Sequence, residues 1–315
     1  MKNMLSVIMP IYNEAQISIG VERTIGVLEN AHIPYELILI DDGSKNDSWN
    51  QITDLAKKHD TITAIPLSRN FGKEHALCAG LDNASGDCCI CIDSDMQHPP
   101  EFIPEMYRLW KEEGYEVVEG VKKARIKENP VYRFCAKSFY NILKKIAGID
   151  LQNASDFRLL DKKALEAWRS MPEKETFFRG MSSWIGFRRT QVYFDVAERE
   201  IGTSKWSLRN LANLAVNAIT SYSSVPLYFA TGFGLLFLLF FLIMFIQTLY
   251  MKLNGYAQTG FTTIIILQLI IGSILLINIG IIGIYIKKIY EEVKNRPRYI
   301  IRRIIKGGSE DGSAE

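Results

Sequence analysis

The sequence predicts an α/β domain with a mostly parallel, doubly wound sheet, followed by two C-terminal transmembrane helices. Short apolar runs alternate with helical patterns over residues 5–92, which is typical of parallel strands joined by helices. No charged residue occurs from Asn210 to Met251, and after Lys252 none occurs before Lys287. A chain of 315 residues with 48% hydrophobic residues can build one large core beside such a membrane region.

The soluble part is predicted element by element from the periodicity of its apolar residues. Four short apolar runs indicate strands, and a helical pattern follows each of the first three. The expected strands are Leu5–Ile11, Glu36–Ile40, Thr63–Leu67 and Asp87–Ile92. The expected helices are Ala15–Glu29, Ser48–His59 and Glu74–Ala84. Because one helix joins each pair of successive strands, the strands are expected to run parallel.

Each of the four expected strands ends in polar or charged residues. These strand ends are Pro10–Glu14, Asp41–Ser44, Ser68–Lys73 and Asp93–Glu101. A single one of these segments could be ordinary turn chemistry. In a doubly wound sheet, however, the carboxyl ends of the strands meet at one edge, where ligands bind. The convergence of four such segments therefore favours a functional site at that edge.

Asp93 and Asp95 are candidate metal ligands. Carboxylate oxygens suit Mg²⁺ or Mn²⁺, and Mg²⁺ usually binds one or two carboxylates together with substrate phosphates. Gln97 can add an amide oxygen or support a bound ligand. A metal that bridges a diphosphate would stabilise the charge that develops as a nucleotide leaves. The sequence contains neither a Gly-x-x-x-x-Gly-Lys-Ser/Thr loop nor a Gly-x-Gly-x-x-Gly segment after a strand, which argues against a nucleotide triphosphatase and a dinucleotide oxidoreductase.

Two apolar stretches are long enough to cross a bilayer as helices. Pro226–Tyr250 and Thr262–Ile286 exceed the roughly 20 residues that a hydrocarbon core of about 30 Å requires. A pair of buried core helices is the alternative, but such helices rarely run this long without a charge. Lys205 and Arg209 before the first span, and the cations after the second, predict that both termini are cytoplasmic. Those later cations are Lys287, Lys288, Lys294, Arg296, Arg298, Arg302, Arg303 and Lys306.

The sequence is therefore divided into six segments. They are a soluble cytosolic domain (1–205), an interfacial amphipathic helical segment (206–225), a first transmembrane helix (226–250), a short external loop (251–261), a second transmembrane helix (262–286) and a basic cytoplasmic tail (287–315). The tail is expected to attract anionic lipids. The first apolar run is too short for a secretory signal. With the soluble domain inside the cell, the five cysteines are expected to be reduced thiols, and their spacing does not indicate a zinc site.

Several motifs together resemble those of the family 2 glycosyltransferases. They are Pro10-x-Tyr12-Asn13-Glu14, Asp41-Asp42-Gly43-Ser44, Arg69-Asn70-Phe71-Gly72-Lys73 and Asp93-x-Asp95-x-Gln97-x-Pro99-Pro100-Glu101. Ser155–Leu159, Gly202–Trp206 and the paired membrane helices extend the resemblance over nearly the whole chain. More narrowly, the chain resembles the polyprenyl-phosphate branch, which includes dolichol-phosphate mannose synthases and bactoprenol (undecaprenyl-phosphate) glucosyltransferases. The resemblance implies a Rossmann-like GT-A nucleotide-sugar transferase domain.

The resemblance also implies roles for individual residues. Nucleotide-sugar binding is implied for Pro10, Tyr12, Glu14, Ile40, Asp42, Asp93, Ser94 and Lys122, and metal binding for Asp93, Asp95 and Gln97. Catalytic roles are implied for Asp95 and for Asp156, which would act as a base or align the substrates unless it only pairs with Arg158. Binding of the lipid phosphate or the diphosphate is implied for Arg133, Lys137, Arg199 and Lys205. For Arg133 and Lys137, a solvated helix face remains an equal alternative.

The reaction implied by the resemblance is metal-dependent, inverting transfer of a sugar to undecaprenyl phosphate at the cytoplasmic face of the plasma membrane. The bacterial branch favours UDP-glucose or UDP-N-acetylglucosamine as the donor. A phosphate monoester carries a charge of about −1.5 to −2 near neutral pH, so it is already a nucleophile. It needs charge screening and alignment more than it needs a base. The product would be a polyprenyl-phosphate sugar for glycosylation of the cell envelope.

Two other functions remain open at this stage. The first is direct transfer to a polysaccharide or glycolipid, but the Gln-x-x-Arg-Trp motif of processive synthases is absent, and the comparable region reads Trp184–Arg189. The second is a non-catalytic membrane scaffold that retains the fold, against which the intact Asp93-x-Asp95 motif and Lys205 argue. Association into a homo-oligomer through the two helices and the tail also remains open. No nucleic-acid partner is expected.

Overall fold

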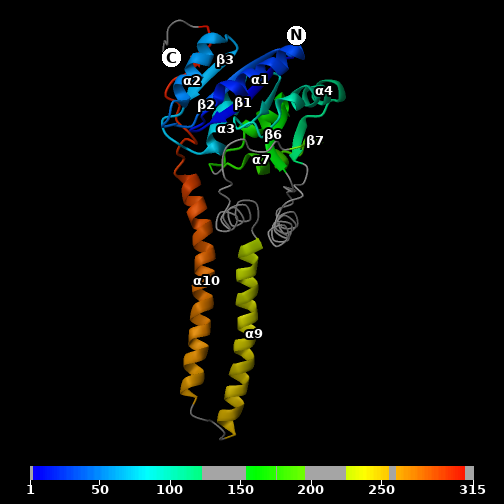
Figure 1. Cartoon of the computed structure of the whole chain (residues 1–315). Coiled ribbons are helices and arrows are strands. Elements are labelled where there is room, and N and C mark those ends of the chain that lie inside the picture. The colour runs from blue at the N-terminus through cyan, green and yellow to red at the C-terminus, as the bar shows by residue number, and fades with distance from the viewer. Residues whose placement is uncertain (1–2, 123–153, 175, 196–224, 255–259, 309–315) are drawn as a thin grey trace. The chain divides into compact units, whose positions relative to one another are not determined.

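The computed structural model describes residues 3–122, 154–174, 176–195, 225–254 and 260–308 (Figure 1). These residues fall into two units. The first unit holds the sheet domain together with residues 296–308, and the second unit holds two long helices.

The sheet domain is built on an 8-stranded sheet with strand order β7-β5-β6-β4-β1-β2-β3-β8. The strands are β1 (Leu5–Ile11), β2 (Tyr35–Asp41), β3 (Ile62–Pro66), β4 (Cys88–Cys91), β5 (Val117–Lys122), β6 (Ala154–Asp161), β7 (Arg189–Phe194) and β8 (Ile305–Lys306). Parallel pairing joins β1 to β2 and β4, β2 to β3, and β5 to β7. Strand β6 is antiparallel to β4 and β5, and β8 is antiparallel to β3. The predicted α/β fold with a mostly parallel sheet is confirmed.

Helices cover both faces of this sheet. One face packs against α1 (Ile17–Asn30), α2 (Ser48–Lys58) and α4 (Ile103–Glu113), which follows the short 3₁₀ turn η1 (Pro100–Phe102). The other face packs against α3 (Lys73–Asn83), α6 (Lys162–Arg169) and α7 (Phe178–Trp184). Successive side chains of a strand point to opposite faces, so on β1 Val7 and Met9 enter the first core and Ile8 enters the second. The seven elements predicted over residues 5–92 are all present, with ends that differ by at most two residues.

Residues 296–308 pack against the sheet domain and extend its edge. Ile305 and Lys306 pair with Ala64 and Thr63 of β3, and the amide of Ser68 donates to the carbonyl of Ile300 at 2.8 Å. An edge strand such as β3 offers a row of unpaired backbone donors and acceptors, and this segment satisfies them. The region predicted as one basic tail thus has two parts, because α10 continues to Val293 and residues 296–308 belong to the sheet domain.

Several cations of this C-terminal segment are bound within the domain. The Arg298 guanidinium lies 5.6 Å from the centre of the Trp168 ring and donates to the carbonyls of Glu173 and Met171. Arg303 lies 5.5 Å from the centre of the Trp49 ring. Arg298 and Arg303, which the sequence predicts to attract lipid, thus contact residues of the sheet domain.

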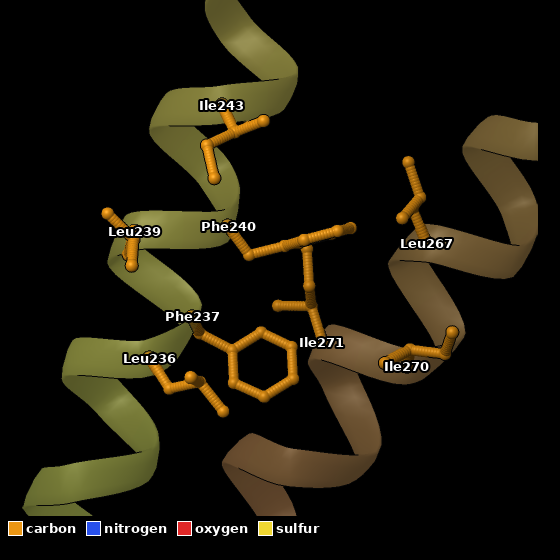
Figure 2. A pocket seen from close by; sticks show the side chains of 8 residues that line it. All are labelled: Leu236, Phe237, Leu239, Phe240, Ile243, Leu267, Ile270 and Ile271. Atoms are coloured by element: carbon orange, nitrogen blue, oxygen red, sulfur yellow. The ribbon is translucent and has the colours of Figure 1, made fainter.

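The second unit contains α9 (Val225–Leu253) and α10 (Phe261–Val293). Both are long and apolar enough to be candidate membrane spans, with mean hydropathy of 2.6 over Leu227–Leu253 and 2.5 over Leu267–Val293. A pocket of about 450 Å³ lies between the two helices, and its walls are entirely apolar (Figure 2). It is lined by Leu236, Phe237, Leu239, Phe240, Ile243, Leu267, Ile270 and Ile271. Side chains of this kind are stable in contact with lipid chains, which fits the predicted transmembrane helices.

Candidate active site

The topology of the sheet brings Asp93 and Asp156 together. Asp93 follows the end of β4, and Asp156 lies near the start of β6. Because β6 runs antiparallel to β4, with Arg158 opposite Cys91, the start of β6 lies beside the end of β4. Asp156 therefore joins the residues at the carboxyl ends of the parallel strands, although it comes from a strand of opposite direction.

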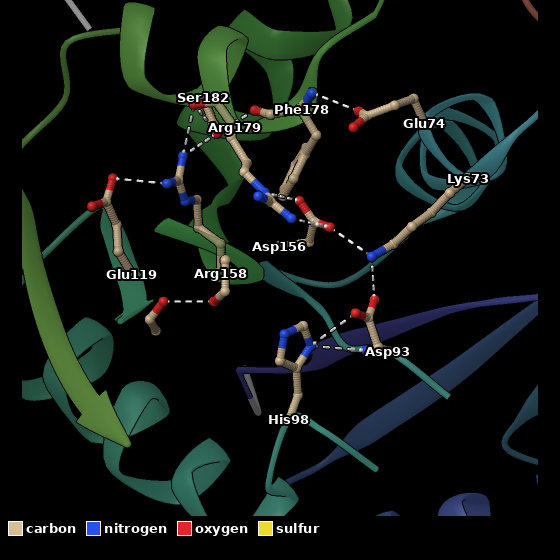
Figure 3. A network of polar contacts seen from close by, with 12 residues as sticks. Lys73, Glu74, Asp93, His98, Glu119, Asp156, Arg158, Phe178, Arg179 and Ser182 are labelled. Carbon is tan, nitrogen blue, oxygen red and sulfur yellow. Dashed lines mark hydrogen bonds and ion pairs between the residues drawn. The ribbon is translucent and has the colours of Figure 1, made fainter. Parts of the chain in front are cut away.

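The ammonium group of Lys73 bridges these two carboxylates (Figure 3). Its Nζ lies 2.6 Å from Oδ1 of Asp93 and 2.6 Å from Oδ2 of Asp156. Burial by itself would lower the pKa of Lys73, but the charges of Asp93 and Asp156 outweigh it and raise the pKa above its ordinary value. Lys73 therefore carries its positive charge throughout the physiological pH range.

Arg179 of α7 holds Asp156 from the other side. Its Nε donates to Oδ1 of Asp156 at 2.6 Å, and its Nη2 donates to Oδ2 at 3.0 Å, which is the bidentate geometry that guanidinium groups favour. Burial of Asp156 tends to raise its pKa, but Lys73 and Arg179 hold the pKa well below its usual range. Asp156 therefore remains ionised and is a poor proton acceptor, which favours alignment over general-base catalysis.

Arg158 does not pair with Asp156, contrary to the alternative raised from the sequence. Its guanidinium lies 3.2 Å from the carboxylate of Glu119 and donates to the hydroxyl of Ser182. Both Arg158 and Glu119 are buried, at 1% and 7% exposure. This second ion pair ties β6 to β5 and to α7, the helix that carries Arg179.

His98 fixes the backbone of Asp93. The amide of Asp93 donates to Nδ1 of His98 at 3.1 Å, and the imidazole stacks on Phe157 with ring centres 5.4 Å apart. Burial lowers the pKa of His98 to about 4, so the ring is neutral and accepts this hydrogen bond. In the same loop, Oδ1 of Asp95 accepts the amide of Gln97 at 3.1 Å, and Met96 adopts a positive φ of 61°.

Asp42 at the end of β2 organises the loop that leads to Lys73. Its carboxylate accepts the amides of Phe71 at 2.7 Å and Gly72 at 2.9 Å, and the side-chain amide of Asn70 at 3.0 Å. At Gly43, a Cβ atom would lie 2.5 Å from the backbone of residues 69 and 70, so only glycine allows the two loops to approach this closely.

Glu74, near Asp156, and Lys122, near Asp93, complete the charged group of the site. Oε2 of Glu74 accepts the amide of Phe178 at 2.7 Å. Burial, together with the nearby charge of Asp156, raises the pKa of Glu74 to about 7. Lys122 lies at the end of β5, where burial lowers its pKa although the charge of Asp93 opposes that effect.

The remaining residues predicted to bind the nucleotide-sugar lie at or just after the ends of β1, β2 and β4. Pro10 and Ile40 are paired neighbours on the two strands, and both are buried. Tyr12 is 47% exposed, and the carbonyl of Glu14 accepts the hydroxyl of Ser48 at 2.9 Å. Ser94 lies between the two candidate metal ligands in the loop after β4. Thus Tyr12 presents an accessible ring at the strand-end edge, whereas Ile40 lies in the core.

Some predicted residues fall outside the described part of the chain. These are the four candidate phosphate-binding residues Arg133, Lys137, Arg199 and Lys205, together with most of the interfacial segment 206–225.

The donor set suits a divalent metal that takes its other ligands from a phosphate. In the described residues, no three His, Cys, Asp or Glu side chains converge into a metal cage. Asp93 and Asp95 still provide two hard carboxylates on one loop, and two carboxylates with substrate phosphates are sufficient for Mg²⁺. Nε2 of Gln97 is buried without a hydrogen-bond partner among the described residues, and as an N–H donor it is available to a phosphate oxygen rather than to the metal.

The sequence predicted the acidic residues of the candidate site, and the structure adds the groups that hold Asp93 and Asp156. Lys73 belongs to the motif Arg69–Lys73, so its position was noticed without a role. Arg179 and Glu74 belong to no motif used in the sequence analysis. Their roles follow from contacts between residues 23 to 104 positions apart in the chain.

Comparisons with known proteins give one consistent result. Residues 6–169 match the sequence family described as glycosyl transferase family 2. The chain is 37% identical over 303 residues to an uncharacterized glycosyltransferase of Synechocystis sp., with 94% of each chain covered. It is 36% identical over 310 residues to the bactoprenol glucosyl transferase of Shigella phage SfII, covering 96% of this chain and 99% of the other.

A solved structure supports the fold. Glucosyl-3-phosphoglycerate synthase from Mycobacterium tuberculosis, in complex with Mn²⁺, UDP-glucose and glycerol 3-phosphate, superposes with a TM-score of 0.50 at 22% identity. The match covers 69% of this chain and 78% of that one.

Proposed function

The chain is a member of glycosyl transferase family 2, and we propose that it transfers a sugar from a UDP-sugar to a polyprenyl phosphate in the membrane. The observation that carries this proposal is the group formed by Asp93, Asp156, Lys73 and Arg179 at the strand ends, in a chain that also contains two candidate membrane spans. Glucose is the favoured sugar because full-length relatives are named bactoprenol glucosyl transferases, and N-acetylglucosamine is the second candidate.

The charges of the site suit a reaction between two phosphate-bearing substrates. Asp93 and Asp95 would hold a Mg²⁺ or Mn²⁺ ion, which when bound supplies positive charge against the donor diphosphate. Lys73, Arg179 and Lys122 add positive charge from the protein itself. Since the acceptor phosphate is already ionised, the site needs to screen and align it more than to deprotonate it.

The low pKa of Asp156 supports an aligning role for this residue. A carboxylate held by Lys73 and Arg179 stays ionised and orients both cations towards the space where phosphates would bind. We propose direct displacement at the anomeric carbon by the acceptor phosphate, which inverts the configuration and converts an α-linked donor into a β-linked product. Arg133, Lys137, Arg199 and Lys205 remain the proposed contacts to the lipid phosphate or diphosphate.

The position of the C-terminal segment supports a hairpin topology in the membrane. Strands β1 to β7 precede the two candidate spans, and β8 follows them in the same sheet. Because a single folded sheet lies on one side of a membrane, this connectivity supports a helical pair whose two ends lead to the same side. We propose that α9 crosses the plasma membrane, that the loop near 255–259 is external, and that α10 returns the chain to the cytoplasm, as the flanking cations indicate.

Transfer of label to a lipid tests this function. Purified full-length protein in detergent is incubated with Mn²⁺ or Mg²⁺, labelled UDP-glucose or UDP-N-acetylglucosamine, and undecaprenyl phosphate. The expected product is a chloroform-soluble sugar, whose anomeric configuration is read by NMR. Undecaprenol without its phosphate is the matched control acceptor and should give no product.

Two results would contradict the proposal. Transfer only to a polysaccharide or glycolipid would support the first alternative. No turnover of any UDP- or GDP-sugar by folded protein would support a non-catalytic scaffold. The variant Asp95→Asn should lose the metal-dependent activity, because it removes one of the two proposed metal ligands, and unchanged product from it would exclude that role.

A further inference from the structure

The two carboxylates bridged by Lys73 differ in what else holds them. Asp156 also forms the bidentate pair with Arg179. For Asp93, Lys73 is the one lysine or arginine within 4 Å of the carboxylate among the described residues, while Nδ1 of His98, at 3.6 Å from Oδ2, accepts the backbone amide of Asp93. Removal of the Lys73 ammonium would therefore leave Asp156 paired and would leave Asp93 without a close positive partner.

The ammonium group of Lys73 can move while the backbone of this residue stays fixed. Its backbone begins α3, and the preceding residues Phe71 and Gly72 donate their amides to Asp42. Its side chain is 42% exposed, whereas that of Asp156 is 3% exposed. A lysine side chain is a compact charge on a flexible four-carbon chain, so the ammonium can change partners without a change in the backbone.

We infer that Lys73 occupies the metal-binding carboxylate of Asp93 in the empty site and exchanges it for a phosphate oxygen when metal and substrate bind. The inference rests on the proposed function, because it takes Asp93 as a metal ligand. In this exchange the divalent ion replaces Lys73 at Asp93, Arg179 keeps Asp156 paired, and the released ammonium pairs with a phosphate. Every buried charge thus has a partner both before and after binding, which avoids the cost of an unpaired buried charge.

The phosphate that receives Lys73 belongs either to the donor diphosphate or to the lipid acceptor. The chemistry is the same in both cases, since an ammonium group binds a phosphate oxygen as a point charge. Lys73 is thereby a residue that touches substrate, and its two pairings have opposite effects on affinity. It competes with the metal before substrate binds, and it adds affinity for the phosphate afterwards.

Binding measurements on Lys73→Met test the exchange without relying on turnover. Free Mn²⁺ is measured by electron paramagnetic resonance on purified full-length protein, and UDP and undecaprenyl phosphate are titrated separately by calorimetry at saturating Mn²⁺. Lys73→Met should bind Mn²⁺ about tenfold more tightly in the absence of other ligands, because a change of about 1.4 kcal/mol in a competing ion pair corresponds to tenfold. It should also bind one of the two phosphate ligands about tenfold more weakly.

Opposite signs for the metal and the phosphate separate this exchange from a merely structural role, which would weaken both. Weaker UDP binding assigns Lys73 to the donor, and weaker undecaprenyl phosphate binding assigns it to the acceptor. Unchanged or weaker Mn²⁺ binding, or unchanged affinity for both phosphates, would overturn the inference. Lys57→Met is the control, because Lys57 is exposed on α2 and pairs only loosely with Asp54 at 3.5 Å.

Lys73→Gln is measured in parallel, and thermal unfolding shows whether each variant is folded. If Lys73→Met does not fold, Lys73→Gln carries the same expectation. Wild-type protein that binds Mn²⁺ and UDP but forms no lipid-linked sugar would contradict the proposed acceptor and leave the exchange standing. Wild-type protein that forms the lipid-linked sugar, with Mn²⁺ binding unaffected in both variants, would contradict the exchange alone.

Discussion

Asp42 and Asp156 are both only 2% exposed, yet they are held in opposite ways. Asp42 accepts two backbone amides and one side-chain amide, so its partners are neutral, and burial raises its pKa. Asp156 lies between two cations, which lower its pKa. The neutral partners of Asp42 fix the backbone of residues 70–72, whereas Lys73 and Arg179 keep Asp156 ionised. Asp42 therefore fixes the loop that leads to Lys73, and Asp156 binds the ammonium group of that lysine.

The largest expected effect is that of Asp156→Asn. The substitution leaves Lys73 and Arg179 without their shared negative partner, and removal of one member of a buried ion pair costs about 3–5 kcal/mol. We expect sugar transfer to fall by about 100-fold or more, since about 2.7 kcal/mol of lost transition-state stabilisation suffices for that factor. Transfer of label to undecaprenyl phosphate measures this. Asp54→Asn, at an exposed site, is the control. If Asp156→Asn retains activity near that of the control, the ion pairs of Asp156 with Lys73 and Arg179 are not required for transfer.

The next effect is that of Asp42→Asn, which should reduce stability. An asparagine places an NH₂ group where one carboxylate oxygen now accepts an N–H, so a donor faces a donor. Loss of a buried hydrogen bond with an unsatisfied group costs about 1–3 kcal/mol. We expect a lower midpoint of thermal unfolding, measured by intrinsic fluorescence in detergent. An unchanged midpoint would mean that the loop does not depend on Asp42.

Glu74 provides a pH-dependent test near the same cluster. Burial first, and then the charge of Asp156, raise its pKa to about 7 from an ordinary value near 4.5. A raised folded-state pKa contributes stability below the unfolded pKa, and that contribution is lost as the pH rises through about 7. Between pH 6 and pH 8, the free energy of unfolding should therefore fall by about 1 kcal/mol in the wild type relative to Glu74→Gln.

Chemical denaturation of both proteins at the two pH values measures this difference. Glutamine keeps an oxygen for the amide of Phe178, so the variant isolates the effect of the charge. Parallel pH profiles for the two proteins would show that Glu74 does not titrate in this range.

The smallest effect is expected at Tyr299, in the C-terminal segment that contacts the sheet domain. The hydroxyl of Tyr299 donates to Asp82 at 2.7 Å, and its neighbour Ile300 accepts the amide of Ser68. Tyr299→Phe should cost at most about 1 kcal/mol, because it removes one hydrogen bond and leaves the strand pairing intact. Thermal unfolding measures the change, and Mn²⁺ binding should stay the same. A large loss of Mn²⁺ affinity in Tyr299→Phe would show that the C-terminal segment affects the metal site.

The sequence predicted the acidic residues of the candidate site and much of the sheet that positions them. Asp42, Asp93 and Asp95 could be assigned to one edge because parallel strands joined by helices place their carboxyl ends together, and periodicity reveals such strands locally. Arg179 could not be assigned in this way. Its partner Asp156 lies on a strand of opposite direction, and nothing near Arg179 in the sequence marks α7 as part of the site.

The C-terminal segment shows the same limit at a larger scale. Its cations read as a basic tail, yet β8 pairs with β3, which lies more than two hundred residues earlier. Strand pairing depends on which edge is open when the sheet is complete, and two residues of β8 carry too little pattern to predict it.

The sequence alone determined the order of strands and helices over residues 5–92, the two apolar helices and the family resemblance, because each depends on local periodicity, length or motif. Only the tertiary structure decided that Lys73 joins Asp93 to Asp156, that Arg179 rather than Arg158 holds Asp156, and that residues 296–308 complete the sheet. The reason is physical. Local patterns follow from neighbouring residues. The partner of a buried charge or of an open strand edge depends instead on which distant segments the tertiary fold brings together.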